Sequence, residues 1–351
     1  MGCTMIKKIV LISVIATLTA GVYANNFNGA IDLMAGIKPE SGKVPAYDSP
    51  NTLILNDHIG QWTYSLTGLM EFQGLMSTHA ATNGLTWKGN RGDYNAIQNT
   101  WGGQVAYDFL NGYTASVNLS YINWKNTDNN PSNYVYPILV TGYQFTPMVT
   151  YTSGVNSYSA NLICQVVGSN DSIAEVSYTG EAPVTPSGNI LNPWNGQKGE
   201  FLQFTPQYSY KGIENWTISS NMVIMQANDN YILLSQAVNN ENNNEIELNP
   251  LMLNYKVESI PGLSLKLDTR YYYYNTVQND PVQATQATVG STKLSLLPGF
   301  SYSHPINSNC VWNLECEVYG KWYTNNLNGQ LAVNKTSKYG ADLYTGISYL
   351  F

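Results

Sequence analysis

Charged residues are scarce in this sequence. They make up 11% of its 351 residues, against about a quarter in an ordinary soluble protein. The 23 acidic residues outnumber the 16 basic ones, which excludes a strongly basic surface, so we expect no nucleic-acid partner. Histidine occurs only at His58, His79 and His304, and no Walker, GxSxG or HExxH pattern is present. The sequence therefore does not favour an enzyme, and we expect neither a cofactor nor a bound metal.

Cysteine is also rare. Besides Cys3, the chain has Cys164, Cys310 and Cys316, and an odd number in an exported chain argues against a disulfide framework. Cys310 and Cys316 fall six residues apart on one predicted strand, which separates them by about 20 Å and prevents a disulfide between them. We predict that these three cysteines are small apolar wall residues.

Long apolar runs are missing except at the N-terminus. There, Lys7 and Lys8 precede an apolar run from Ile9 to Ala20, which leads to a small-residue site at Ala24. This pattern is typical of a signal peptide over residues 1–24, so we predict cleavage after Ala24. The run is too short to span a bilayer comfortably, and no other segment could anchor the chain as a helix. The mature chain keeps 14 basic residues against 23 acidic ones, a net charge near −9.

Alternation of apolar and polar residues runs through the rest of the chain. In the C-terminal segment Tyr339, Leu343, Ile347 and Phe351 lie on one face, and Asp342 lies on the other. A period of two over roughly ten residues is typical of a transmembrane β-strand. Similar alternation occurs in segments 62–72, 101–109 and 113–121. The terminal Phe351 resembles the C-terminal signature of bacterial outer-membrane β-barrels, and the resemblance implies an assembly signal.

A diverged repeat organises the later chain. Segment Gln144–Tyr151 resembles Gln203–Tyr210, and segments 248–255 and 296–302 are looser copies. Each copy carries a proline, which is unfavourable inside a paired strand, so we predict a bulge or weak pairing at a shared height. Short turns follow the copies near Ser153-Gly154, Lys211-Gly212, Pro261-Gly262 and Pro305-Ile306, and Asn111-Gly112 predicts another tight turn.

Polar segments rich in Asn, Asp, Ser and Gly alternate with these turns. We predict them to be long extracellular loops opposite short periplasmic turns, as in outer-membrane barrels. They are residues 126–133, 168–199, 227–244, 276–290 and 325–337.

The expected fold is therefore an all-β, transmembrane, antiparallel up-and-down barrel of about 14 strands over residues 25–351. The early strands are predicted near Phe27–Ile37, Gln61–Met76 and Leu85–Gly89. Without the last of these the count becomes 12, with the first residues as a plug. An additional strand near Ile173–Thr179 could bring it to 16.

Aromatic residues cluster at the predicted strand ends, as in the interfacial girdles of membrane barrels. One band lies near the short turns, at Tyr107, Phe109, Tyr113, Tyr151, Tyr210, Trp216, Tyr302 and Trp312. The other is predicted near the long loops, at Trp62, Trp101, Trp124, Tyr143, Tyr271, Tyr273 and Trp322.

A barrel of this width is too wide for side chains to fill, so its inward residues should line water. Charges of both signs there would set the ion preference of a pore. Counting from the turns also predicts that Arg270 and Glu317 share a height. The candidate pore-lining residues are Glu71, Asp108, Lys266, Asp268, Arg270, Lys293, Glu315, Glu317, Lys321 and Asp342.

The whole mature chain resembles the outer-membrane channel superfamily, closest in size and layout to the OmpG-type monomeric porins and the oligogalacturonate-type porins. The resemblance implies an outer-membrane porin for passive diffusion of small hydrophilic solutes and ions. It also implies contact with outer-membrane lipid, lipopolysaccharide and the barrel-assembly machinery, as a monomer or a trimer. Acidic-sugar porins line their lumen with arginine, whereas the only arginines here are Arg91 and Arg270. We therefore expect a weakly cation-preferring or unselective pore.

Two other function classes stay open at this point. In the first, the Asn-rich loops plug the lumen and act as an adhesin, so that the barrel is a structural support. In the second, the barrel is an outer-membrane enzyme, which would need His58 or His79 as acid–base groups. Neither histidine has a Ser or Asp partner at a recognisable spacing.

Overall fold

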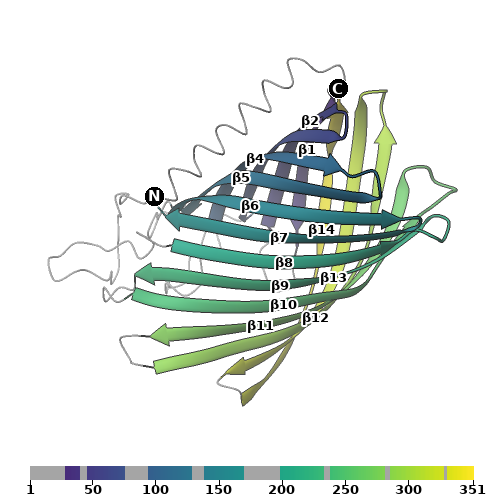
Figure 1. Cartoon of the computed structure of the whole chain (residues 1–351). Coiled ribbons are helices and arrows are strands. Elements are labelled where there is room, and N and C mark those ends of the chain that lie inside the picture. The colour runs from purple at the N-terminus through teal and green to yellow at the C-terminus, as the bar shows by residue number, and fades with distance from the viewer. Residues whose placement is uncertain are drawn as a thin grey trace.

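The described residues form one closed barrel. The computed structural model describes residues 28–39, 46–75, 94–128, 138–169, 198–232, 238–280, 285–327 and 330–351. Their 14 strands are antiparallel, each pairs with its neighbours in sequence, and β1 pairs with β14 to close the wall (Figure 1). This confirms the predicted up-and-down barrel and its strand count. Within the described ranges, no helix is long and apolar enough to cross a membrane.

The strands are longer than the segments predicted from alternation. They are β1 (Asn28–Lys38), β2 (Ala46–Ile59), β3 (Trp62–Leu75), β4 (Tyr94–Asp108), β5 (Tyr113–Asp128), β6 (Ile138–Ser153), β7 (Asn156–Ser169), β8 (Lys198–Tyr210), β9 (Trp216–Ile232), β10 (Val238–Lys256), β11 (Leu263–Asp280), β12 (Thr285–Pro305), β13 (Cys310–Leu327) and β14 (Gln330–Leu350).

One strand was not predicted. Residues 46–59 form β2, which pairs with β1 and β3, so the early residues are wall and not plug. The prediction reached 14 by counting residues 85–89 instead. That segment lies outside the described residues, as do the signal peptide with Ala24, His79, Arg91 and segment 173–179. Since β3 pairs directly with β4, the wall has no place for a further strand between them.

Three of the predicted loops are wrong, because the strands continue into them. β9 extends to Ile232, and β10 begins at Val238. In the same way, β11 extends to Asp280, and β12 begins at Thr285. The same holds for the end of β13 and the start of β14. Beyond an apolar layer both faces of a strand can meet water, so alternation disappears there although the backbone ladder persists. In these asparagine-rich ends, for example, Asn240 of β10 still pairs directly with Asn279 of β11.

The predicted weak pairing at the prolines is confirmed. Two residue pairs are missing from the ladder around Pro147 between β6 and β7, around Pro206 between β8 and β9, and around Pro298 between β12 and β13. At Pro250 the register of β10 shifts against both neighbours, which is a bulge. Proline has no N–H to donate, so each interruption follows from its chemistry.

The two clearest copies of the repeat also share a side-chain contact. The Gln144 amide donates to the Thr146 hydroxyl at 3.1 Å, and the Gln203 amide donates to the Thr205 hydroxyl at 3.0 Å. Both contacts lie just before the proline of their strand. The sequence repeat is therefore a repeat of local structure.

A fifth interruption, at Pro50 in β2, is repaired by side chains. The Ser49 hydroxyl donates to the carbonyl of Met34 at 2.6 Å, and the Asn51 carbonyl oxygen accepts from the N–H of Met34 at 3.3 Å. The Asn51 amide also donates to the carbonyl of Met70 on β3 at 3.4 Å. These polar side chains replace the ladder bonds that Pro50 cannot make, which explains why the apolar pattern of β2 is broken.

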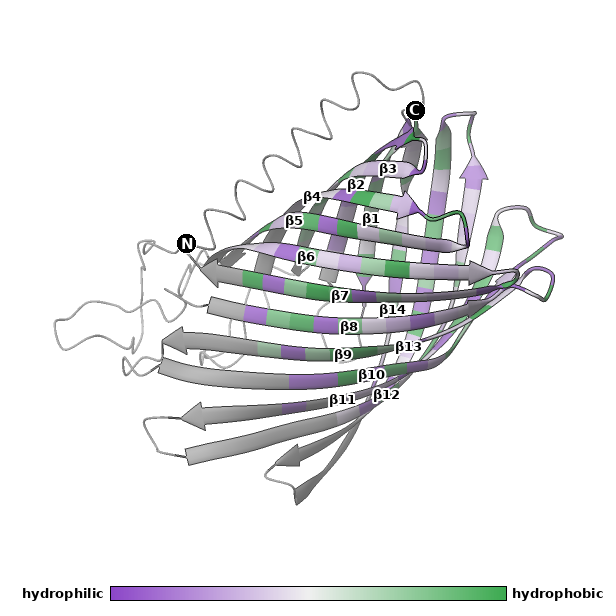
Figure 2. Ribbon diagram, in the orientation of Figure 1, coloured by the Kyte–Doolittle hydropathy of each residue, from purple (hydrophilic) through white to green (hydrophobic). Residues whose placement is uncertain are grey.

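Outward-facing side chains are apolar and exposed, while the alternate, inward positions are mostly polar. On β1, for example, Leu33 is 58% exposed and lies between the inward-facing Asp32 and Met34. The same alternation of green and purple runs along the strands in Figure 2. Among the described residues, the only fully buried large apolar side chains are Leu297 and Tyr319. The barrel thus has little apolar core and a large apolar outer surface.

Short turns bring aromatic rings together on the outside of the wall. At the Asn111-Gly112 turn, Gly112 has φ +79°, a conformation that glycine adopts without strain. Tyr113 stacks on Tyr151 with ring centroids 4.3 Å apart. The ring centroids of Trp62 and Tyr107 are 4.7 Å apart, so Trp62 belongs to the band at the short turns. The prediction that it lies in the other band is wrong, because the missed strand β2 reverses the direction of β3.

Candidate functional site

The inner wall of the barrel is divided into two chemically different halves. From β4 to β9 the inward side chains that the structure describes are hydroxyls, amides and a few apolar groups. The only charge among them is Asp108, at the end of β4. Representative residues are Thr100, Gln104, Ser116, Asn118, Gln144, Thr146, Ser159, Asn161, Gln203, Gln207 and Asn221.

The other half, from β10 through β14 and β1 to β3, carries the charges. Among its described inward side chains, acidic groups outnumber basic ones. The acidic residues are Asp32, Asp48, Glu71, Glu245, Glu247, Asp268, Glu315, Glu317 and Asp342, and the basic residues are Lys38, Lys256, Lys266, Arg270, Lys293, Lys321 and Lys338.

Nine of the ten predicted pore-lining residues lie on the inward wall of this charged half. Asp108 is the exception, because it is exposed at the short-turn end and its carboxylate accepts the N–H of Leu110 at 2.8 Å. Asp108 therefore shapes a turn at the rim of the barrel. The other nine have the inward parity expected from alternation along a strand, and their role in lining a pore stays a prediction.

Strand pairing arranges the charges of β11 to β14 in two rows. In the first, Lys266 lies opposite Gly299, Gly299 opposite Glu317, and Glu317 opposite Asp342. We call this the mixed row. The prediction that Arg270 shares a height with Glu317 is wrong, because strand pairing places Lys266, and not Arg270, level with Glu317. Counting residues from the turns ignored how neighbouring strands are staggered in a barrel.

The second row is basic. Arg270 lies opposite Ser295, Ser295 opposite Lys321, and Lys321 opposite Lys338. We call this the basic row. On all four strands it lies four residues from the mixed row, on the side away from the short turns. The ammonium of Lys321 sits 3.6 Å from the ring centroid of Tyr319, which holds this cation against the wall.

A pocket opens in the wall at the mixed row. Its volume is about 130 Å³, and its lining includes Lys266, Gly299, Glu315, Glu317, Asp342 and Tyr344. Gly299 packs closely against β13 there, because a Cβ would come within 2.6 Å of the carbonyl oxygen of Cys316. Glu317 lies within electrostatic range of Arg270, Asp268, Asp342 and Lys266.

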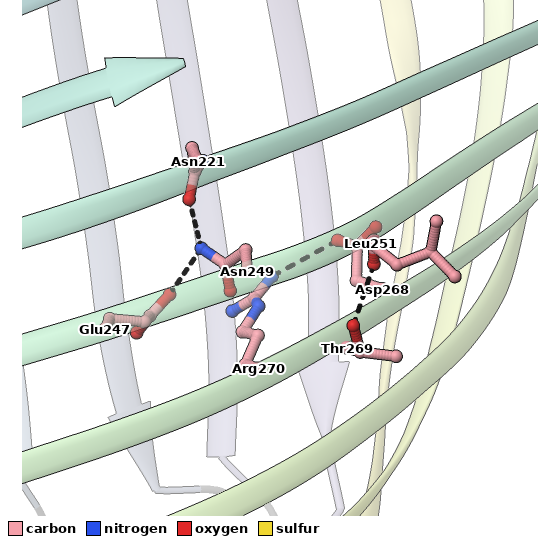
Figure 3. Close-up of polar contacts among 7 residues, drawn as sticks. All are labelled: Asn221, Glu247, Asn249, Leu251, Asp268, Thr269 and Arg270. Atoms are coloured by element: carbon pink, nitrogen blue, oxygen red, sulfur yellow. Dashed lines mark hydrogen bonds and ion pairs between the residues drawn. The ribbon is translucent and has the colours of Figure 1, made fainter. Parts of the chain in front are cut away.

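The bulge at Pro250 sets the surroundings of Arg270. The buried Asn249 amide donates to Glu247 at 3.0 Å and also to Asn221 on β9 (Figure 3). Arg270 lies opposite the bulge, and its guanidinium is 3.5 Å from the carboxylate of Asp268. This long, partly exposed contact leaves the guanidinium facing the interior of the barrel.

A polar cluster that the sequence did not predict lies where the barrel closes. Lys38 on β1 forms an ion pair with Asp48 on β2, and the Tyr344 hydroxyl on β14 donates to the same carboxylate oxygen at 2.7 Å. Asp48 is 3% exposed. Because β2 was not predicted, Asp48 could not be placed on an inward face, although the alternation of β14 does point Tyr344 inward.

The two described histidines have ordinary wall contacts. The His58 ring nitrogen Nδ1 lies 3.0 Å from the Thr63 hydroxyl, and the His304 ring stacks on Tyr302. Within the described ranges, no group of three or more His, Cys, Asp or Glu side chains is arranged to hold a metal ion. The three cysteines there are free.

No known protein family matches the sequence, and no curated protein does. Similar solved structures include CymD, a monoaromatic hydrocarbon channel, with 7% identity over 97% of this chain and 92% of that chain and a TM-score of 0.47. The Ralstonia pickettii toluene transporter TbuX has 12% identity over 94% and 91%, with a TM-score of 0.45. OmpT, an outer membrane protein of Vibrio cholerae, has 13% identity over 93% and 100%, with a TM-score of 0.40. The likeness is one of general barrel shape.

Proposed function

We propose that this chain is an outer-membrane channel for passive diffusion of small hydrophilic solutes and ions. The observation that supports it best is the arrangement of the wall, which is the reverse of that in a soluble protein: apolar side chains are exposed on the outside, and polar or charged side chains face inward. An apolar outer surface of this extent needs a lipid environment. A closed barrel satisfies all backbone groups within that environment, because it has no sheet edge.

The proposed orientation places the short turns in the periplasm and the opposite rim of the barrel outside, with Phe351 at the periplasmic end. In this arrangement the outer surface contacts outer-membrane lipid and lipopolysaccharide, and the C-terminal strand is the part offered to the barrel-assembly machinery. Membership of the OmpG-type or oligogalacturonate-type porins stays a prediction, as does the choice between monomer and trimer.

A weak cation preference belongs to the same proposal. Acidic side chains outnumber basic ones on the described inner wall, and fixed charge in a pore concentrates ions of opposite sign. Because the charged half contains both signs in similar numbers and the other half is nearly neutral, the preference should be small.

A swelling assay tests the proposed diffusion function. Residues 25–351 are refolded, reconstituted into liposomes and exposed to neutral sugars of increasing size. We expect swelling that is fast for monosaccharides and slower for larger sugars, because passage through a water-filled pore depends on solute size. Liposomes that contain the folded, heat-modifiable barrel but swell no faster than protein-free liposomes would reject passive diffusion.

A further inference from the structure

The two charged rows of the inner wall are spaced like the two ends of a short peptide. Four residues of strand separate Arg270 from Lys266 on β11 and Lys338 from Asp342 on β14. At about 3.3 Å per residue this separation is about 13 Å between the backbone positions of the two rows. An extended peptide of three to four residues spans about 10–14 Å.

The charges of the two rows have the signs that such a peptide needs. The pocket of the mixed row holds the carboxylates of Glu315, Glu317 and Asp342 against the ammonium of Lys266. The guanidinium of Arg270 also lies within electrostatic range of Glu317. Three acidic groups against two basic ones leave a small net negative charge, which favours a cationic group. The carboxylates in the described wall are not arranged to share a metal ion. A pocket of about 130 Å³ instead suits an organic ammonium, which is bound by several separated acceptors.

The basic row supplies cationic groups, which attract the carboxylate end of such a peptide. Arg270 and Lys321 flank the small, buried side chain of Ser295. Guanidinium and ammonium groups at this height favour a carboxylate, which a guanidinium can bind with two parallel hydrogen bonds.

We propose that the wall formed by β11 to β14 binds short zwitterionic peptides, with the ammonium end in the pocket of the mixed row and the carboxylate end at the basic row. This inference rests on the proposed channel function and names a solute class for it. The peptide lies along the strands, so it enters from the rim opposite the short turns with its amino end first. The neutral amide and hydroxyl groups of β4 to β9 face its backbone across the lumen.

Block of single-channel current by glycine oligomers tests this inference. Glycine peptides of two to five residues are added to the refolded mature chain in a planar bilayer at neutral pH, since their uncharged side chains isolate the effect of length. We expect half-maximal block at the lowest concentration for the three- and four-residue peptides. N-acetylation or C-amidation of the four-residue peptide should each weaken block about two- to fivefold, the range for partly exposed charge pairs.

Variants assign the two ends separately. E317Q should remove the advantage of the free amino group while the effect of C-amidation remains, and R270M should do the reverse. The matched control is D32N, which also removes one carboxylate from the inner wall but lies six residues further along the wall, at the level of Ser348. D32N should leave peptide block unchanged.

The outcomes separate this inference from the proposed function. A conducting channel that no peptide blocks, or that all lengths and capped forms block equally, overturns peptide binding and leaves the channel in place. Equal loss of block in E317Q and D32N also overturns it, because block would then follow total lumen charge. A folded barrel that never conducts overturns the proposed function itself.

Discussion

Asp48 is a single side chain that joins three strands. Its buried carboxylate binds the ammonium of Lys38 on β1 and the hydroxyl of Tyr344 on β14. These are the strands whose pairing closes the barrel. A barrel has no sheet edge only while this pair holds, so contacts here protect the whole wall.

Asp48→Ala should therefore lower the stability of the folded barrel by about 1–3 kcal/mol, because it removes a hydrogen bond to a charged group and leaves Lys38 without its partner. Tyr344→Phe removes only one of these contacts and should cost less, about 0.5–1.5 kcal/mol. Urea unfolding in detergent, followed by tryptophan fluorescence, measures both. Equal stability of D48A and wild type would show that the cluster does not hold the closure.

Phe351 contributes to the same closure through its backbone and its ring. Its N–H and C=O exchange hydrogen bonds of 3.1 and 2.9 Å with Gly29, and its ring lies over that glycine. Phe351→Ala keeps the backbone bonds and loses the packing of a ring that is 42% exposed, so refolding in detergent should be close to wild type.

If Phe351 is also read by the assembly machinery, the same F351A variant should accumulate much less in the outer membranes of expressing cells. The heat-modifiable fraction on gels, compared between refolded and cell-derived protein, separates the two roles. A parallel loss in both samples would limit Phe351 to packing.

At the level of strands, β2 shows how proline is accommodated in a continuous wall. Ser49 and Asn51 face outward, where an apolar residue would be normal, and supply the bonds that Pro50 cannot make to β1. Their polarity follows from local backbone chemistry and does not indicate a binding surface.

Asn51→Leu should accordingly destabilise the barrel by about 1–2 kcal/mol, although it adds apolar surface on the outside, because a backbone N–H of β1 loses its acceptor. Ser220→Leu, another outward polar-to-apolar change on β9, is the matched control and should be neutral or stabilising. Urea midpoints of the two variants decide the matter. A stability gain in both would mean that Asn51 makes no contribution to the ladder.

Alternation in the sequence was sufficient to predict most strands, the short turns and the inward parity of the charges. It failed at β2, where side chains that repair Pro50 break the pattern, and the direction assigned to Trp62 failed with it. It also failed at the strand ends, where residues such as Asn240 and Asn279 pair without alternation. The two charged rows could not be predicted, because a row depends on the stagger between strands and the sequence of one strand does not contain it.

For the molecule as a whole, the inner wall combines a neutral half with a charged half of small net negative charge. Ion selectivity should therefore respond to substitutions on β13 and β14. E315Q combined with E317Q should move the reversal potential under a KCl gradient towards zero, and K321M combined with K338M should move it further in the cation direction. Identical reversal potentials in the two variants would show that the ions do not pass along this wall.

The most direct test of the account is single-channel recording of refolded residues 25–351 in a planar bilayer under a salt gradient. We predict stable current steps and a reversal potential that shows a weak preference for cations. A folded, heat-modifiable barrel that stays electrically silent would contradict the channel, and stable steps with a clear preference for anions would contradict the role assigned to its inner wall.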